Sequence, residues 1–345
     1  MVMIPRRFFL GTLLGIAPLA FALQPRLIRI AQIGAEHSHA GGKLEALRHL
    51  TSLYEVAAIS AAGRPSGAVY AGIPLMEEAE LLAIPGLHAV TVETRVEEAC
   101  GAALRALRAG KHVHLDKPGA LSHPEFRAMR LEAERRGLCL QMGYMLRANP
   151  AFEWLFKAVR AGWLGEVLEI DAAMGKMADS KTRSAIGALE GGGMFELACH
   201  LIDAVLTILG KPTEVVARST PSNNDSVRDN QIALLVYPRA TATIRCNHAD
   251  PFGSAHRRFK VTGTKGAVEI QPLESGEFSV SLVESAGGMK KGVQHLKLPL
   301  PRGRYDEEFV ELARVIRGEK AYGWSAAHDI AVHETVLLAA GLDPR

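Results

Sequence analysis

The sequence has few cysteines and no large excess of charge of either sign. Its four cysteines, at positions 100, 139, 199 and 246, lie far apart without a C-x-x-C pair, so their spacing indicates neither a zinc knuckle nor a disulfide framework. The formal net charge of +3 comes from 40 basic and 37 acidic residues, and this balance predicts no basic surface for nucleic acid. What remains is a chain of 345 residues, 48% of them hydrophobic. That is enough for two globular domains with cores of their own.

No apolar run is long enough to predict a membrane-spanning helix. The run closest to the N-terminus covers residues 10–23, fewer than the roughly 20 that a span needs. Arg6 and Arg7 precede this run, and Ala20-Phe21-Ala22 resembles a signal cleavage site. We expect residues 1–25 to be a twin-arginine signal peptide rather than an uncleaved anchor, and the mature protein to be periplasmic or secreted with no stable membrane span. Since this route exports folded proteins, the signal also favours a cofactor acquired before export.

Short apolar runs alternate with helical patterns in the first half of the chain. This alternation is typical of βαβ units and a parallel sheet. The strand-like runs are Leu27–Ile33, Tyr54–Ser60, Leu87–Val92, His112–Leu115 and Leu138–Met142, and the helical segments are Ala40–Leu50, Val96–Ala109 and His123–Arg136. The pattern predicts a Rossmann-type, doubly wound domain over residues 26–147.

The second half, residues 148–345, has strand patterns that follow one another without intervening helices. Such an order predicts an α+β domain with an open, mostly antiparallel sheet. The expected strands are Glu214–Ser219, Gln231–Tyr237, Thr241–Cys246, Arg258–Thr262, Ala267–Ile270 and Phe278–Val283, and the expected helices are Asn149–Ala161, Met194–Leu209, Asp306–Arg317 and Ala326–Ala340. Because an open sheet needs covering, we expect a homo-oligomer formed through it.

Lys117 stands at the end of an apolar run and directly before Pro118. In open α/β sheets the ligand binds at the carboxyl ends of the strands, so a cation in this place faces a bound molecule. Proline restricts the residue before it, which predicts a stiff support for the lysine. The alternative is an ordinary surface lysine at the start of a loop.

A polar stripe interrupts the apolar segment that follows three glycines at positions 191–193. Glu196, His200 and Asp203 are spaced i, i+4 and i+7, which predicts that they share one face of a helix. Burying this stripe without partners would be costly, so we expect it to face a ligand or water. Histidine suits proton transfer near neutral pH, and we interpret His200 as a general acid/base oriented by a carboxylate. The alternative is a structural Glu–His–Asp network.

Taken in order, these segments and several others resemble the Gfo/Idh/MocA family of nicotinamide-dependent oxidoreductases of sugars and polyols. The matching stretches are Ala109–Val113, Asp116–Pro118, Gly143–Arg147, Asn149–Phe152, Gly162 with Leu164–Val167, Gly191–Asp203 and Thr262–Gly266. The resemblance covers nearly all of the chain after the expected signal. It implies a Rossmann domain followed by an α/β domain built on an open, mostly antiparallel sheet.

Carried to the matching positions, the resemblance implies catalytic roles for Lys117, Glu196 and His200. Lys117 matches the lysine of the family's E-K-P motif, which contacts the substrate hydroxyl beside the nicotinamide, and Asp116 replaces the glutamate. A cationic ring nearby would lower the pKa of the lysine. His200 matches the catalytic histidine, and Glu196 replaces an aspartate four residues before it.

The resemblance also implies a carbohydrate-binding cleft. Tyr144 and Arg147 belong to a motif that lines the cleft, and Asp203 matches an acid of the helix motif, so we predict that all three bind substrate. The implied reaction is hydride transfer between a secondary hydroxyl of a sugar and NAD or NADP, with Lys117 and His200 handling the proton. The cofactor would be tightly held outside the cytoplasm. An NAD-dependent glycosidase that oxidises and re-reduces its substrate would use the same residues.

The expected dinucleotide loop departs from the family's pattern. Such a loop usually reads G-x-G-x-x-G, but residues 34–39 read GAEHSH. Only Gly34 is retained, and Glu36 would bring negative charge toward a phosphate. We nevertheless assign Gly34, Glu36, His37 and His39 to the cofactor site.

Two further loops depart as well. Ser60 stands where a ribose-binding acid is usual, and Arg64 follows closely, which slightly favours NADP over NAD. The loop after the third strand reads ETRV, without the usual proline and asparagine. Ser60, Arg64, Asp116 and Lys117 complete the predicted cofactor site. The departures motivate a second hypothesis, a carbohydrate-binding protein that has lost the cofactor.

Paired histidines offer a rival interpretation. His37 and His39 have the spacing of metal ligands in metal-dependent hydrolases, and His112 and His114 repeat it. Those hydrolases need a barrel of about eight βα units, whereas this chain changes to consecutive strands halfway. We therefore expect no metal site, and we expect His112 and His114 to lie on one face of a strand.

Overall fold

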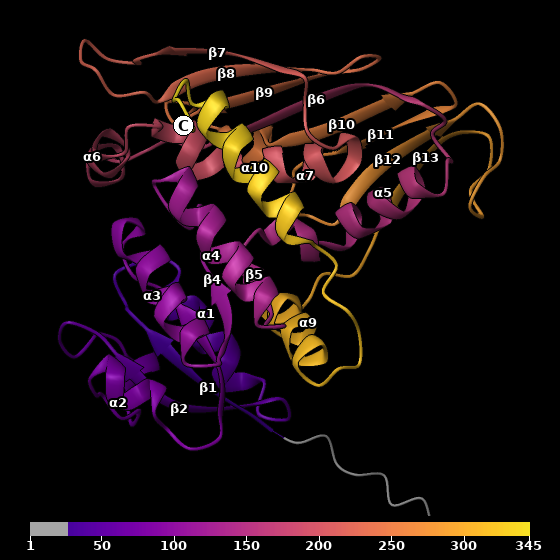
Figure 1. Cartoon of the computed structure of the whole chain (residues 1–345). Coiled ribbons are helices and arrows are strands. Elements are labelled where there is room, and N and C mark those ends of the chain that lie inside the picture. The colour runs from indigo at the N-terminus through magenta and orange to yellow at the C-terminus, as the bar shows by residue number, and fades with distance from the viewer. Residues whose placement is uncertain (1–26) are drawn as a thin grey trace, which may run out of the picture.

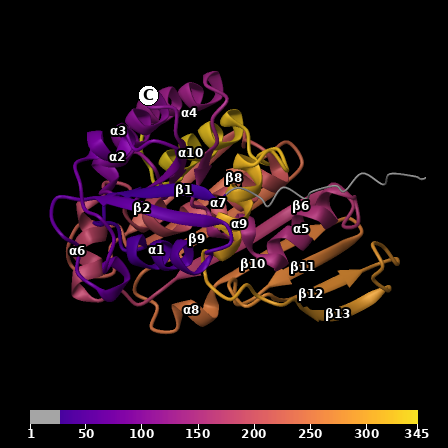
Figure 2. The same cartoon turned by 90° about the horizontal axis from the view of Figure 1, so that it is seen from below.

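The computed structural model describes residues 27–345, whose strands form two sheets (Figure 1). The expected signal peptide lies outside the described residues. Among those residues, no helix has both the length and the apolar character needed to cross a membrane. The first sheet lies beneath one side of the second, and strands at the far side of the second sheet extend beyond it (Figures 1 and 2).

The first sheet is parallel, with the strand order β2-β1-β3-β4-β5. Its strands are β1 (Ile28–Ile33), β2 (Tyr54–Ser60), β3 (Leu87–Val92), β4 (His112–Leu115) and β5 (Leu140–Met142). The connections contain α1 (Ala40–His49), η1 (Ala68–Tyr70), α2 (Glu78–Leu82), α3 (Val96–Arg108) and α4 (His123–Arg135). The strand order reverses at β1, which creates a crevice at the carboxyl ends of the strands. The predicted Rossmann-type fold is confirmed.

Helices cover both faces of this sheet. Apolar side chains of α3 and α4 pack on one face, and those of α1 and of α9 (Asp306–Ile316) pack on the other. The hydroxyl of Tyr54 on β2 donates a hydrogen bond to the carbonyl of Phe309 on α9, at 2.6 Å. The chain therefore returns to its first sheet after completing the second one.

The second sheet has eight strands in the order β13-β12-β11-β10-β6-β9-β8-β7. They are β6 (Val167–Gly175), β7 (Glu214–Thr220), β8 (Asn230–Val236), β9 (Thr241–Asn247), β10 (Arg258–Gly263), β11 (Gly266–Ile270), β12 (Glu277–Leu282) and β13 (Gly292–Lys297). All neighbours are antiparallel except β6 and β9. The predicted open, mostly antiparallel sheet is confirmed, although β6 and β13 were not among the expected strands.

Helices line the face of this sheet that looks toward the first domain (Figure 1). They are α5 (Pro150–Arg160), α7 (Cys199–Leu209) and α10 (Ala326–Ala339), while η2 (Met145–Ala148), α6 (Ser180–Ala188) and α8 (Gly253–His256) lie in connections. The start of α5 follows from local chemistry, because Asn149 accepts hydrogen bonds from two backbone N–H groups and Pro150 occupies the first turn.

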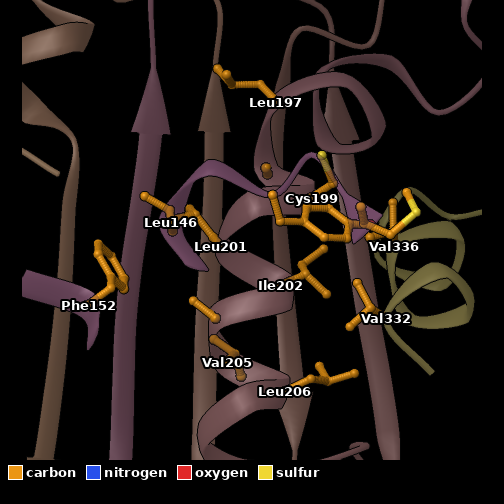
Figure 3. Close-up of a cluster of buried hydrophobic side chains, with 14 of the residues drawn as sticks. Leu146, Phe152, Leu197, Cys199, Leu201, Ile202, Val205, Leu206, Val332 and Val336 are labelled. Carbon is orange, nitrogen blue, oxygen red and sulfur yellow. The ribbon is translucent and has the colours of Figure 1, made fainter. Parts of the chain in front are cut away.

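The long helix expected over Met194–Leu209 begins with a π-helical turn. This turn, η3, covers Met194–Ala198 and is followed by α7. Every residue from Cys199 to Leu206 is buried, because α7 lies between the second sheet and α10 (Figure 3). Fully burying one large apolar side chain contributes about 1.5–3 kcal/mol, so packing on all sides fixes α7 firmly in place.

Candidate active site

Lys117 follows β4 at the carboxyl ends of the parallel strands, as the sequence predicted. The residue is 4% exposed, and its Nζ donates a hydrogen bond to the backbone carbonyl of Glu196, at 2.5 Å. The Lys117–Pro118 peptide bond is cis. The strand end of the first domain and the π-helical turn of the second therefore meet at this lysine.

Glu196 is surrounded by three cationic or protonatable groups. Its carboxylate lies 3.7 Å from Nζ of Lys117, 3.5 Å from Nζ of Lys176 and 3.3 Å from Nε2 of His248. Burial by itself would raise the pKa of the Glu196 carboxyl, but Lys117, His248 and Lys176 hold it well below its usual range. Burial by itself would lower the pKa of Lys117, but the charge of Glu196 prevails and raises it. The pair is therefore an ammonium facing a carboxylate.

Lys176 and His248 were missed from the sequence. Each directly follows a strand, β6 for Lys176 and β9 for His248, and the last residues of these strands, Gly175 and Asn247, pair with each other. Because β6 and β9 are parallel, both side chains reach the same edge of the sheet. A polar residue directly after each of the two strands could have indicated this site. It was not recognised because β6 was not predicted.

His200 lies in the first turn of α7, next to Tyr144. It is 2% exposed, and its ring meets that of Tyr144 edge-on with centroids 6.0 Å apart. Burial, reinforced by the nearby charge of Lys117, lowers the pKa of His200 well below its usual value. The imidazole is therefore neutral near pH 7, and its Nδ1 has no hydrogen-bond partner among the described residues.

We expected a carboxylate of the same helix to orient His200. The described contacts contradict this expectation, because both carboxylates bind other residues. Glu196 is engaged by Lys117, Lys176 and His248, as described above, and Asp203 accepts hydrogen bonds from Arg147. The physical reason is that each carboxylate has cationic or protonatable partners of its own. Glu196 lies in the π-helical turn before α7 and contacts Lys117, whereas Asp203 lies in α7 and contacts Arg147.

Arg147 and Asp203 belong to a buried ion-pair network. Nη2 of Arg147 lies 2.5 Å from Asp203 and 2.6 Å from Asp329 of α10. His328 also contacts Asp203, at 3.0 Å, and Arg130 of α4 contacts Asp329, at 3.1 Å. The guanidinium stacks on Tyr144, with its carbon 4.8 Å from the ring centroid. The predicted substrate-binding residues Arg147 and Asp203 are thus brought together, but they contact each other.

The turn after β1 retains the geometry of a dinucleotide loop at Gly34. Its φ is +83°, and a Cβ in this position would lie 2.6 Å from Thr94, so only glycine allows this close approach. The first turn of α1 carries no acidic side chain, which leaves the positive end of the helix dipole suited to an anion. These features fit the pyrophosphate of a dinucleotide.

Glu36 occupies part of that loop. Its carboxylate accepts a hydrogen bond from the backbone N–H of Ala35, at 2.8 Å, and the side chain is exposed. A phosphate could take this N–H after the Glu36 side chain swings into solvent. The loop therefore fits a dinucleotide on that condition. Ser60 ends β2, and the exposed Arg64 lies in the loop beyond it.

A second charged cluster lies beneath this loop. Asp116 accepts a hydrogen bond from Nζ of Lys43, at 2.6 Å, and lies 3.1 Å from His37 and 3.0 Å from His39. Glu93 lies 3.2 Å from Lys43. Burial raises the pKa of Glu93 to about 8 and lowers the pKa of His39 to about 4. The predicted cofactor residues His37, His39 and Asp116 thus form one cluster.

The second histidine pair, His112 and His114, is not part of this cluster. The ring of His112 accepts a hydrogen bond from the N–H of Cys139, at 2.9 Å. Nδ1 of His114 bonds Gln141, also at 2.9 Å. Strand β5 and the residue directly before it therefore engage both rings.

Two family models match the chain. One, described as an oxidoreductase family with an NAD-binding Rossmann fold, matches residues 28–144, and the other, described as a GFO/IDH/MocA C-terminal domain, matches residues 152–269. A bovine trans-1,2-dihydrobenzene-1,2-diol dehydrogenase is 27% identical over 55% of this chain and 57% of its own length. The chain thus spans little more than half of that relative.

Solved structures show the same fold. An aldose-aldose oxidoreductase from Caulobacter crescentus superimposes with a TM-score of 0.76 and 23% identity, covering 92% of this chain and 98% of that one. A levoglucosan dehydrogenase in complex with NADH and levoglucosan has a TM-score of 0.77 and 16% identity with the same coverage. The two sheets, their order and both family models lead to one conclusion: the chain belongs to the Gfo/Idh/MocA family of oxidoreductases, with an NAD-binding type of Rossmann domain.

Proposed function

We propose that the protein is an NAD(P)-dependent oxidoreductase that acts on a secondary hydroxyl group of a sugar or sugar derivative. The observation that carries the proposal is a charged Lys117 at the end of β4 close enough to a neutral His200 to influence its pKa, while Nδ1 of His200 has no hydrogen-bond partner among the described residues. Lys117 can donate a hydrogen bond to the oxygen of a substrate hydroxyl, and His200 can accept the proton of that hydroxyl.

The division of labour follows from the two protonation states. The ammonium of Lys117 stabilises negative charge on the substrate oxygen. Its electrostatic attraction is stronger in a buried site than in water, and the cation is already in place before the reaction. The neutral imidazole of His200 accepts the hydroxyl proton during oxidation and returns it during reduction. Glu196 is a positioning residue, since it keeps Lys117 charged. When bound, the nicotinamide supplies the hydride acceptor or donor.

Several residues would hold the dinucleotide. The pyrophosphate fits the turn at Gly34 and the N-terminus of α1, once Glu36 has moved into solvent. Arg64 is exposed and follows β2 without an acidic neighbour at Ser60, which favours a ribose 2′-phosphate. We therefore propose NADP over NAD.

We infer the proposed substrate class from the names of similar proteins. Their printed names include a diol dehydrogenase, an aldose-aldose oxidoreductase and a levoglucosan dehydrogenase, all of which act on compounds with hydroxyl groups. An NAD-dependent glycosidase would use the same Lys117 and His200. We also propose export through the twin-arginine route and self-association through the open sheet, each on the sequence patterns described above.

One observation favours a different function. The carboxylate of Glu36 already occupies an N–H group of the dinucleotide loop, as it would in a carbohydrate-binding protein without cofactor. Turnover separates the two candidates. We expect purified protein to reduce NADP⁺ or NAD⁺ with at least one member of a panel of aldoses, alditols and anhydrosugars, and His200→Ala to lose at least ~100-fold in kcat.

A variant that tests the electrostatic role is Lys117→Met, which keeps the length of the side chain and removes its charge. It should lower kcat by a similar factor. Full activity of both variants would refute the assignment of the site. A protein that binds sugar but neither dinucleotide would support the binding-protein alternative.

A further inference from the structure

The loop after β1 and the end of β4 bring together ligand atoms of three residues that were predicted to lie in the cofactor site. Nδ1 of His37 lies 3.1 Å from Oδ2 of Asp116, and Nδ1 of His39 lies 3.0 Å from the same atom. The ligand atoms of the three residues all lie within 4.8 Å of one another. We propose that His37, His39 and Asp116 bind one divalent transition-metal ion, of the kind that imidazole and carboxylate ligands favour.

The distances are close to those of a metal site. Ligand atoms about 2.0–2.2 Å from a tetrahedral ion lie roughly 3.4 Å from one another. The two imidazoles must therefore retreat from Asp116 by only a few tenths of an ångström to admit an ion. Three protein ligands leave a coordination position open, as in catalytic rather than structural sites. The side chains of His37 and His39 are 21% and 20% exposed, so the ion has a path from solvent.

More carboxyl groups than cations lie directly beside the proposed ligands. Asp116 and Glu93 are buried carboxyl groups, and Lys43 is the one buried ammonium that the described contacts place against both. A divalent ion would add positive charge beside these two carboxyl groups, where an unpaired buried carboxylate would be costly.

Glu93 provides a second observation that favours a ligand beside His37. Its side chain is fully buried, and among the described residues neither carboxylate oxygen accepts a hydrogen bond. One oxygen lies 3.2 Å from Nζ of Lys43, and the other lies 3.8 Å from Nδ1 of His37. An unpartnered carboxylate is thus aimed at the proposed ligands. Lys43 donates to Oδ2 of Asp116, which is the type of outer hydrogen bond that supports ligating carboxylates.

A second group of similar composition provides an internal contrast. Asp203, His328 and Asp329 also bring three ligand atoms together. Arg147 contacts both of these carboxylates and Arg130 contacts one, so two guanidinium groups balance the two negative charges. No charge is left for an ion to neutralise, and the same ligand types are expected to stay empty there.

The ion would take an oxygen ligand in its open position. Asp116 immediately precedes Lys117 and influences its pKa, so an ion bound to Asp116 would be a neighbour of the proposed catalytic lysine. A water molecule or a hydroxyl or phosphate oxygen fits the chemistry. Metal-dependent hydrolases hold their paired histidines in a barrel, whereas the ligand atoms of His37, His39 and Asp116 are brought together here by the loop after β1 and the end of β4.

Cobalt(II) is the probe that tests the site most directly. Protein without an affinity tag is stripped with a chelator and titrated with Co²⁺, whose visible absorption reports nitrogen and oxygen ligands, while Zn²⁺ is added as a competitor. We expect one Co²⁺ per chain, displaced by Zn²⁺, and an affinity lowered at least ~100-fold in both His37→Ala and His39→Ala. The matched control is His328→Ala, which removes a histidine from the contrasting group and should leave the affinity unchanged.

A milder variant keeps the test valid if an alanine variant folds poorly. Glu93→Gln retains the shape of the side chain and should weaken Co²⁺ binding, because it replaces a carboxyl oxygen that faces the proposed ligands. No saturable Co²⁺ binding to folded wild-type protein would overturn the proposal, as would equal affinity of wild-type protein and a folded His37→Ala/His39→Ala variant. Binding of NAD(H) and NADP(H) is measured separately on the stripped protein. Failure of the metal site and failure of the proposed function are therefore distinguishable.

Discussion

Replacing Arg147 with methionine separates a structural role from substrate binding. Arg147 is 4% exposed and holds Asp203 and Asp329 together, at 2.5 and 2.6 Å. Methionine fills much of the space but removes the charge, so both buried carboxylates lose a partner. Removing one member of a buried ion pair costs about 3–5 kcal/mol.

The expected loss is large enough to measure by calorimetry or circular dichroism. At roughly 2 °C per kcal/mol for a chain of this size, Arg147→Met should lower Tm by about 6–10 °C. Asp203→Asn should have an effect of the same order, because it leaves Arg147 with Asp329 alone. The double variant should cost less than the sum of the two, since the shared contact is lost only once.

A substrate-binding role makes the opposite prediction for the same variants. If Arg147 contacts the substrate, KM rises while Tm stays near the wild-type value. If Arg147 joins α10 to α7, Tm falls while KM, measured at a temperature where the variant is folded, stays the same. An unchanged Tm with a raised KM would refute the structural account.

Three further predictions follow from single positions. Gly34→Ala should weaken dinucleotide binding at least ~10-fold and cost about 1–2 kcal/mol, because its positive φ is strained for other residues and a Cβ would clash with Thr94; calorimetric titration measures the first effect and thermal unfolding the second. Glu196→Gln should lower the pKa of Lys117 and move the alkaline limb of the pH profile of kcat to lower pH, whereas a purely structural role would leave the limb in place. Burial lowers the pKa of His333 to about 4. Between about pH 6.5 and 4, His333 is therefore protonated in the unfolded chain but neutral in the folded chain. His333 should therefore contribute about 3 kcal/mol to the fall in stability as the pH drops from about 6.5 to 4, and His333→Gln should remove that share when the free energy of unfolding in urea is measured over this range.

Much of the fold was accessible from the sequence because hydrophobic periodicity is local. The five parallel strands and the helices between them were each bounded by glycine, proline or polar residues, which mark the ends of elements. Strand β6 was missed since its partners β9 and β10 lie about 70 to 90 residues further along the chain. Pairing over such a distance leaves no local pattern.

The site could be predicted only in part for the same reason. Lys117 and His200 carried recognisable motifs, and the structure places both in one buried region. The partners of Glu196, which are Lys176 and His248, come from two strand ends that meet only in the folded sheet. The π-helical turn was equally invisible, because the spacing of Glu196 and His200 fits an ordinary helix.

Calorimetric titration of the purified protein with NADPH and NADH tests the central claim most directly. A Rossmann domain that works with Lys117 and His200 must bind a nicotinamide dinucleotide. We predict saturable binding of one molecule per chain, tighter for NADPH because of Arg64, and weakened by Gly34→Ala. Folded protein that binds neither dinucleotide at any concentration up to the millimolar range would contradict the account.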